Sequence, residues 1–191
     1  MADNALSDEG ITAVASALSG NNGHGASLVL LDLAQNQLGR QGAESLSLLM
    51  NHPHGCILKT LKLSKCRAGD AGGARIFEAL QDQVTVTDLD VSFNDLGSRT
   101  VAKALNNLLE DNSTLQRLGL GWNEFGSHAC KHIRSSLSQN LSLLELDLRW
   151  NSVGDVGAME IGAALRHNKV LQTLDLTHCN VAERGAMVRT N

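Results

Sequence analysis

Residues 143–153 read LLELDLRWNSV, and this stretch decides the fold because its pattern recurs along the chain. The pattern is an apolar residue, two variable residues, Leu-x-(Leu or Val), two variable residues, Asn or Cys, one variable residue and an apolar residue. Six segments carry it: 28–38 (LVLLDLAQNQL), 58–68 (LKTLKLSKCRA), 86–96 (VTDLDVSFNDL), 115–125 (LQRLGLGWNEF), 143–153 and 171–181 (LQTLDLTHCNV). Their starts lie 30, 28, 29, 28 and 28 residues apart, and a period this regular predicts a stacked array of repeats.

Each repeat predicts one short strand followed by one helix. Alternating leucines give the strand one apolar face, and later residues such as Ile161, Ala164 and Leu165 recur at helical spacing. Neither element buries its apolar face alone, so neighbouring repeats must supply the core. Strand–helix–strand connections require a parallel sheet.

The pattern resembles the leucine-rich repeat, in the ribonuclease-inhibitor-like subtype with repeats of 28–29 residues, over nearly the whole chain. The resemblance implies an α/β horseshoe-shaped solenoid with a parallel sheet on the concave face and helices on the convex face. We predict a single solenoid over residues 1–191. It comprises a partial repeat at 1–27 and repeats 1 to 6, which start at residues 28, 58, 86, 115, 143 and 171, the last being incomplete. Two loops interrupt the period, a mobile one at 19–25 and a shorter one at 51–56.

Both ends of the chain fall inside a repeat, and solenoids normally finish in polar caps. Three explanations stay open. The chain is a segment of a longer array, another chain covers the exposed end, or the last helix, within 185–191, is frayed.

The composition argues against several classes of protein. The net charge is −4 with Lys and Arg scattered, which argues against a nucleic-acid binder. No run of about 18 apolar residues is present to span a membrane, and the N-terminus MADNALSDEG lacks the apolar stretch of a secretion signal. We therefore expect a cytoplasmic protein, with a cytoskeletal or ciliary location as a further expectation, that binds neither membranes nor nucleic acids.

One polar position recurs where each strand leaves the sheet. It holds Asn or Cys, and an amide there is expected to satisfy buried backbone groups repeat after repeat. The six residues are Asn36, Cys66, Asn94, Asn123, Asn151 and Cys179. The glycines that follow in five repeats are expected to suit the turn before the helix: Gly39, Gly69, Gly97, Gly126 and Gly154.

Catalytic and metal-binding motifs are absent from the sequence. His128 and His132 lie four residues apart, which suits zinc, but Cys130 between them occupies an inward-facing position. The His52 and His54 pair flanks the single proline. We interpret the histidines as surface residues and the four cysteines as reduced thiols, and we predict no metal, no cofactor and no enzymatic activity.

The concave face carries two rows of interest. A middle row is mostly acidic: Asp32, Lys62, Asp90, Gly119, Asp147 and Asp175. Lys62 lies between Asp32 and Asp90 on adjacent strands, which predicts a cross-strand ion-pair row of little net energy. At the exit edge of the strands lie Gln35, Lys65, Phe93, Trp122, Trp150 and His178, which include three of the five aromatic residues. Two interpretations of these aromatics stay open and do not exclude each other. They anchor a partner, or they stack on one another and shield the asparagine row from water.

The leading interpretation is a non-enzymatic protein-interaction module that binds a partner, basic in character, on its concave face. The candidate partner-binding residues are Phe93, Trp122, Trp150, His178, Asp90, Asp147, Asp175, Arg149, Glu145 and Arg117. One alternative is a structural subunit of a large cytoskeletal or ciliary assembly, held in a larger complex through its uncapped ends. Another is a regulator of an enzyme, either inhibiting a nuclease or activating a GTPase.

Overall fold

A computed structural model describes residues 1–19, 28–51 and 57–182. Helices and strands alternate throughout these ranges. The helices are α1 (Asp8–Leu18), α2 (Arg40–Met50), α3 (Gly69–Leu80), α4 (Arg99–Asp111), α5 (Ser127–Gln139) and α6 (Gly154–Leu165). The strands are β1 (Leu30–Asp32), β2 (Thr60–Lys62), β3 (Asp88–Asp90), β4 (Arg117–Gly119), β5 (Glu145–Asp147) and β6 (Thr173–Asp175). The expected loops at 19–25 and 51–56 lie, except for their first residues, outside the described part, as does the expected helix within 185–191.

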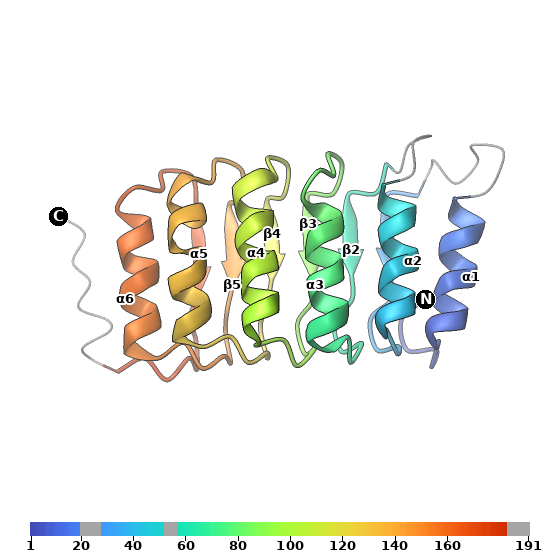
Figure 1. Cartoon of the computed structure of the whole chain (residues 1–191), viewed down its shortest axis with the longest axis horizontal. Coiled ribbons are helices and arrows are strands. Elements are labelled where there is room, and N and C mark those ends of the chain that lie inside the picture. Colours follow the sequence, from blue (N-terminus) through green and yellow to red (C-terminus); the bar gives the residue numbers. More distant parts are fainter. Residues whose placement is uncertain (20–27, 52–56, 183–191) are drawn as a thin grey trace.

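The strands form one parallel sheet in the order β1-β2-β3-β4-β5-β6. Equivalent positions pair without offset, so the central leucines Leu61, Leu89 and Leu118 lie side by side on adjacent strands. The helices form a second layer that covers one face of this sheet (Figure 1). The predicted α/β solenoid is therefore confirmed. The face of the sheet that points away from the helices is called the open sheet face below.

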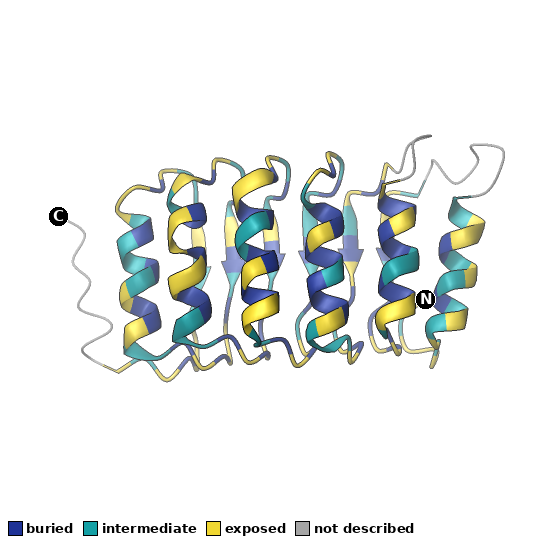
Figure 2. Cartoon of the chain, in the orientation of Figure 1, coloured by how far each residue is buried: buried dark blue, intermediate teal, exposed yellow. Residues whose placement is uncertain are grey.

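Leucine fills the space between the two layers. Residues that directly follow the strands, such as Leu33, Leu63 and Leu120, are fully buried, and so are the helix residues Leu46 and Leu105. Figure 2 shows the centres of the strands as buried, and each helix alternates buried and exposed sides. The core also contains two aromatic residues, Phe77 and Phe125, which leaves the other three for other roles.

The predicted asparagine ladder runs through the turns that follow the strands. The Asn123 amide donates to Val91 O at 3.1 Å and to Leu120 O at 2.9 Å, and its oxygen accepts from the backbone N–H groups of Asn94 and Leu96. Cys66 replaces the amide in repeat 2, where its thiol donates to Leu33 O at 3.1 Å. These side chains satisfy backbone groups of two adjacent repeats, which would otherwise be buried without a partner.

A second ladder, absent from the sequence analysis, lies at the opposite edge, between each helix and the next strand. Its members are buried and lie three residues before the first apolar position of a repeat: Gln83, Asn112, Asn140 and Asn168. Asn140 donates to Leu109 O at 2.8 Å and accepts from the N–H groups of Ser142 and Leu143. Its constant offset from the repeat start was the sequence signal that could have revealed it.

The turn glycines have more than one role. Gly69 and Gly154 adopt φ values of 58° and 62°, the left-handed conformation that favours glycine. Gly39 and Gly126 also directly precede a helix, but their backbones are extended with negative φ, which any residue can adopt. At Gly97 the constraint is space, since a Cβ would lie 2.6 Å from Glu124 Cβ.

Candidate protein-binding surface

The six residues of the exit row share one unusual backbone conformation. Gln35, Lys65, Phe93, Trp122, Trp150 and His178 all have φ between 56° and 59°. This left-handed conformation costs roughly 1–2 kcal/mol for a residue with a side chain. The backbone N–H of Trp122 donates to Arg149 O, and that of Trp150 donates to Thr177 O, both at 2.8 Å. Bonds of this kind to the next repeat hold the row in place.

Four rings of this row form a continuous stack, called the aromatic strip below: Phe93, Trp122, Trp150 and His178. Successive ring centroids lie 4.8, 4.2 and 4.0 Å apart, with interplanar angles of 12°, 16° and 26°. The Lys65 ammonium lies 5.0 Å from the Phe93 centroid and covers the free face of that ring. Phe93, Trp122 and Trp150 remain 38, 40 and 41 % exposed. Because the inner ring faces are occupied by neighbours, the strip presents mainly its ring edges to solvent.

The acidic middle row has a local structural role. One carboxylate oxygen of Asp90 accepts from Ser92 N, that of Asp147 from Arg149 N, and that of Asp175 from Thr177 N, at 2.8–3.0 Å. These side chains thus satisfy the backbone where each strand ends. Burial raises the pKa of Asp147, with Asp175 and Asp90 adding to the rise and the backbone N–H and charge of Arg149 opposing it. Hydrogen bonds from Thr177 lower the pKa of Asp175.

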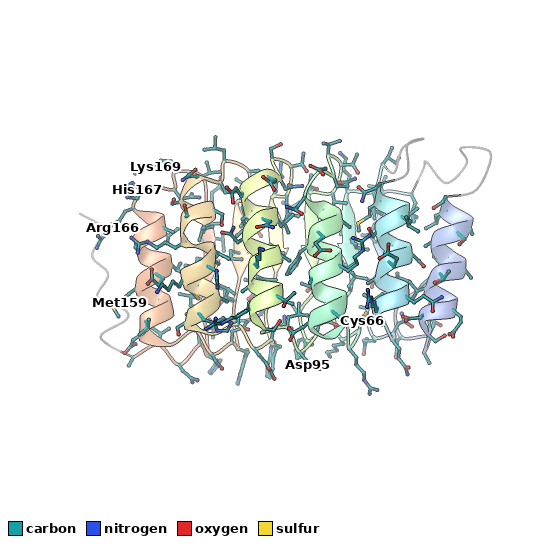
Figure 3. All side chains as sticks on the ribbon, viewed as in Figure 1. Cys66, Asp95, Met159, Arg166, His167 and Lys169 are labelled. Atoms are coloured by element: carbon teal, nitrogen blue, oxygen red, sulfur yellow. The ribbon has the colours of Figure 1, made fainter. Side chains whose placement is uncertain are left out.

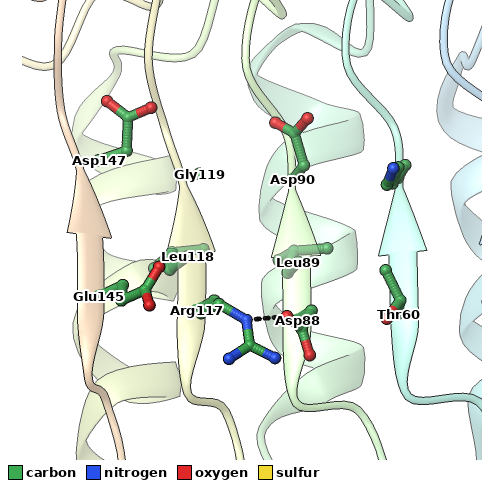
Figure 4. Close-up of a pocket in the computed structure, with 10 residues that line it drawn as sticks. Thr60, Asp88, Leu89, Asp90, Arg117, Leu118, Gly119, Glu145 and Asp147 are labelled. Atoms are coloured by element: carbon green, nitrogen blue, oxygen red, sulfur yellow. Dashed lines mark hydrogen bonds and ion pairs between the residues drawn. The ribbon is translucent and has the colours of Figure 1, made fainter.

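Two arginines on the open sheet face form ion pairs with aspartates. Arg117 pairs with Asp88 across adjacent strands, and the Arg149 Nε lies 2.9 Å from Asp147 Oδ2. Burial alone would raise the pKa of Asp88, but hydrogen bonds from Arg117 and Thr87 outweigh it and lower the pKa. Figure 4 shows Arg117 reaching Asp88, with Asp90 and Asp147 on either side of Gly119.

A shallow hollow lies on the open sheet face where Gly119 has no side chain. Glu145 lines this hollow together with Arg117. Lys62 lies in register between Asp32 and Asp90, an arrangement in which a cross-strand ion pair was expected. That expectation was wrong, because no ion pair of the described residues includes Lys62.

Two acidic residues beside the strip escaped the sequence analysis. Asp95 and Glu124 lie two residues after Phe93 and Trp122, at equivalent register positions, and both are exposed. Asp95 projects from the edge of the molecule where the strands exit (Figure 3). Their signal in the sequence is the repeat register, in which both stand two residues after an aromatic residue.

The sulfur and imidazole groups form no site in the described part of the chain. Cys66, Cys130 and Cys179 are buried free thiols, and burial raises the pKa of Cys130 to about 12. Within residues 1–19, 28–51 and 57–182, no three metal-ligating side chains lie close enough together to hold an ion. Cys56, His52 and His54 lie outside these ranges. None of the helices in the same ranges has the length and apolar character needed to cross a bilayer.

Comparison with known proteins agrees with the repeat architecture. The profile of the Leucine Rich repeat family matches residues 26–47, 83–99, 139–162 and 167–188. The chain therefore contains leucine-rich repeats in these residues. The ribonuclease-inhibitor-like subtype stays a prediction.

Relatives of known sequence include two proteins named "NACHT, LRR and PYD domains-containing protein 12". The chain is 38 % identical to the one from Mus musculus over 111 residues, which are 58 % of this chain and 10 % of the relative. It is 36 % identical to the one from Homo sapiens over 124 residues, which are 65 % of this chain and 11 % of the relative. The matched part of the chain thus spans about a tenth of the length of these relatives.

Two solved structures resemble this one. The actin-binding site 2 of leiomodin-1 is 27 % identical, with a TM-score of 0.53, over 56 % of this chain and 62 % of that chain. The C-terminal domain of tropomodulin from Caenorhabditis elegans has a TM-score of 0.60 over 78 % of this chain and 87 % of that chain. At 14 % identity, the tropomodulin match concerns the fold alone.

Proposed function

We propose that this chain is a non-enzymatic protein-interaction module that binds a protein partner along the aromatic strip, at the exit edge of its open sheet face. The observation that carries the proposal is the exposure of Phe93, Trp122 and Trp150 in consecutive repeats, while the other two aromatics of the chain are buried. Exposed aromatic side chains ringed by polar groups are typical of the residues that dominate binding energy at protein interfaces.

The rigidity of the strip supports the same proposal. Ordering a flexible side chain at an interface costs roughly 0.5–1.5 kcal/mol. The rings of Trp122 and Trp150 are already held by stacking on both sides and by a fixed backbone, so little of that cost remains. The stack also suits the shielding role, because the ladder residues Asn123 and Asn151 directly follow the two tryptophans and are buried. A partner would contact the outer edges of rings whose inner faces stabilise the fold.

A cytoskeletal role is the second candidate, and one observation favours it. The leiomodin-1 structure is named as an actin-binding site, and it is 27 % identical to this chain over 56 % of this chain. Actin is therefore the first defined partner to test, by co-sedimentation with filaments and by binding to monomeric actin. A cytoplasmic, cytoskeletal location belongs to this candidate. Regulation of an enzyme, and assembly through the chain ends, stay predictions.

The chain itself suggests a substitution that tests the strip without disturbing its backbone. Gln35 occupies the exit row of repeat 1 with φ 59°, close to the 56° of both tryptophans. The double variant Trp122→Gln/Trp150→Gln should therefore fold. The matched control, Leu48→Gln/Leu141→Gln, removes apolar side chains that are 64 and 82 % exposed outside the exit row.

The measurement is quantitative affinity capture of partners from cells, with unfolding midpoints recorded to confirm folding. We expect the strip variant to lose a specific partner that the wild-type chain and the control variant both retain. Retention of every specific partner by a folded strip variant would contradict the proposal.

A further inference from the structure

The aromatic strip is bordered by carboxylates on its sheet side and, beside Phe93 and Trp122, on its other side as well. On the sheet side, Asp90, Asp147 and Asp175 each lie three residues before a strip residue. On the other side, Asp95 lies two residues after Phe93, and Glu124 lies two residues after Trp122. Because the strands pair without offset, equivalent positions fall into rows, and the strip lies between two such rows.

Most of these carboxylates have no cationic partner. Among the described residues, Arg149 pairs with Asp147, and no ion pair includes Asp90, Asp95, Glu124 or Asp175. Asp95 and Glu124 are exposed. Negative charge on both sides of an apolar strip attracts cationic groups and disfavours anionic ones.

The opposite charge marks one end of this surface. Repeat 2 exposes Lys62, Lys65 and Arg67, and Lys65 covers the end of the strip at Phe93. A basic partner is therefore repelled from repeat 2 and attracted to repeats 3 to 6. The charge pattern fixes where along the solenoid such a partner lies.

We propose that the strip and its two acidic borders bind a segment of a partner protein in which apolar side chains alternate with lysine or arginine. The apolar side chains contact the ring edges of Trp122 and Trp150, and the cationic side chains reach the carboxylates on either side. Ring faces inside the stack are occupied, so the cations pair with carboxylates and not with the faces of these rings. This inference rests on the proposed function and specifies the chemistry of the partner.

Synthetic peptides test this chemistry directly. One fluorescein-labelled peptide alternates leucine and arginine, a second carries glutamate in place of arginine, and a third carries serine in place of leucine. Binding is measured by fluorescence anisotropy. We expect the leucine–arginine peptide to bind at least tenfold more tightly than either of the others, and less tightly as salt is added. Failure of the leucine–arginine peptide to bind, or equal binding of the glutamate or serine peptide, would overturn the inference.

Variants with reversed charge separate the inference from the proposed function. Arg67 occupies the position of Asp95 in repeat 2 with nearly the same φ, 53° against 55°, so Asp95→Arg suits the backbone. The variant Asp95→Arg/Glu124→Arg should weaken the leucine–arginine peptide about tenfold. A control with the same change of charge, Asp82→Arg/Glu110→Arg, should change its affinity less than twofold, because both residues are exposed and lie where the helices end, at the edge opposite the strip.

The combined outcomes are decisive. If Trp122→Gln/Trp150→Gln loses the peptide but the charge-reversed variant retains it, the strip binds proteins and the acidic borders do not select them. The inference then fails and the proposed function stands. If both variants bind the peptide like the wild-type chain, the peptide sits elsewhere and the inference fails. The cellular capture experiment then decides the proposed function separately.

Discussion

The indole ring of Trp122 stacks on that of Trp150 with the centroids 4.2 Å apart and 16° between the planes. These are the two tryptophans of the chain, and they belong to adjacent repeats. The pair therefore joins repeats 4 and 5 outside the leucine core, while about two fifths of each side chain faces solvent. A structural contact and an exposed apolar edge are provided by the same two rings.

The asparagine ladder predicts a graded response to substitution at Asn123. Asn123→Ala leaves buried backbone groups of two repeats without a partner and should lower the free energy of unfolding by about 3 kcal/mol or more. Asn123→Cys should cost clearly less, because Cys66 and Cys179 fill the same position and donate to backbone carbonyls. Urea unfolding of both variants checks the order. Equal losses would contradict this account of the two cysteines.

The left-handed backbone of the exit row predicts an unusual preference for glycine. Trp122→Ala loses two stacking contacts and keeps a side chain at φ 56°. Trp122→Gly loses the same contacts but relieves the backbone, so it should be more stable than the alanine variant by about 1 kcal/mol. Chemical unfolding of the two variants measures the difference. A more stable alanine variant would show that the row is not strained.

The two acidic residues Asp147 and Asp175 should respond to pH with opposite signs. Burial raises the pKa of Asp147 in the folded chain, so ionisation of this side chain destabilises the fold. The stability is therefore higher in acid and falls as pH rises through the raised pKa. Asp147→Asn should therefore be more stable than the wild-type chain at neutral pH, and the gain should vanish in acid. Its amide oxygen can still accept from Arg149 N.

Asp175 is the matched control for that experiment. Hydrogen bonds from Thr177 lower the pKa of Asp175, so its ionised form stabilises the fold. This stabilisation is complete above the ordinary pKa of an aspartate and is lost as pH falls through the lowered pKa. Asp175→Asn should be less stable than the wild-type chain at neutral pH, with the difference shrinking in acid. Urea unfolding at neutral and acidic pH tests both variants, and the same sign for both would contradict these assignments.

The buried thiols should be unreactive in the folded protein. Burial raises the pKa of Cys130 to about 12 and also raises those of Cys66 and Cys179, so little thiolate forms at neutral pH. In a Cys56→Ser background, a thiol reagent such as DTNB should react slowly with the folded chain and completely after denaturation. A rapid phase in the folded state would show that one of these thiols is accessible.

The repeat pattern was sufficient to predict the architecture. Residues such as Leu61, Leu89 and Leu118 are apolar because they face the helices, and a fixed period places them side by side. The same register correctly placed the three aromatics in one exposed row. These features follow from periodicity, which a single sequence displays.

Contacts that depend on side-chain geometry could not be predicted in this way. The hydrogen bond from Arg149 N to Asp147 and the pairing of Arg117 with Asp88 depend on how each side chain is oriented. The sequence shows that the middle row is mostly acidic, but not that its carboxylates accept hydrogen bonds from the backbone where the strands end. Asp95 and Glu124 were missed because no apolar pattern marks their row.

Titration of a captured partner, followed through tryptophan emission, tests the central claim most directly. Both tryptophans of the chain lie in the strip, so their emission reports on this surface alone. If the strip is the binding surface, saturation with partner should change the emission, and Trp122→Gln/Trp150→Gln should bind at least tenfold more weakly than wild type. Unchanged emission at saturation, together with full affinity of the folded variant, would contradict the claim.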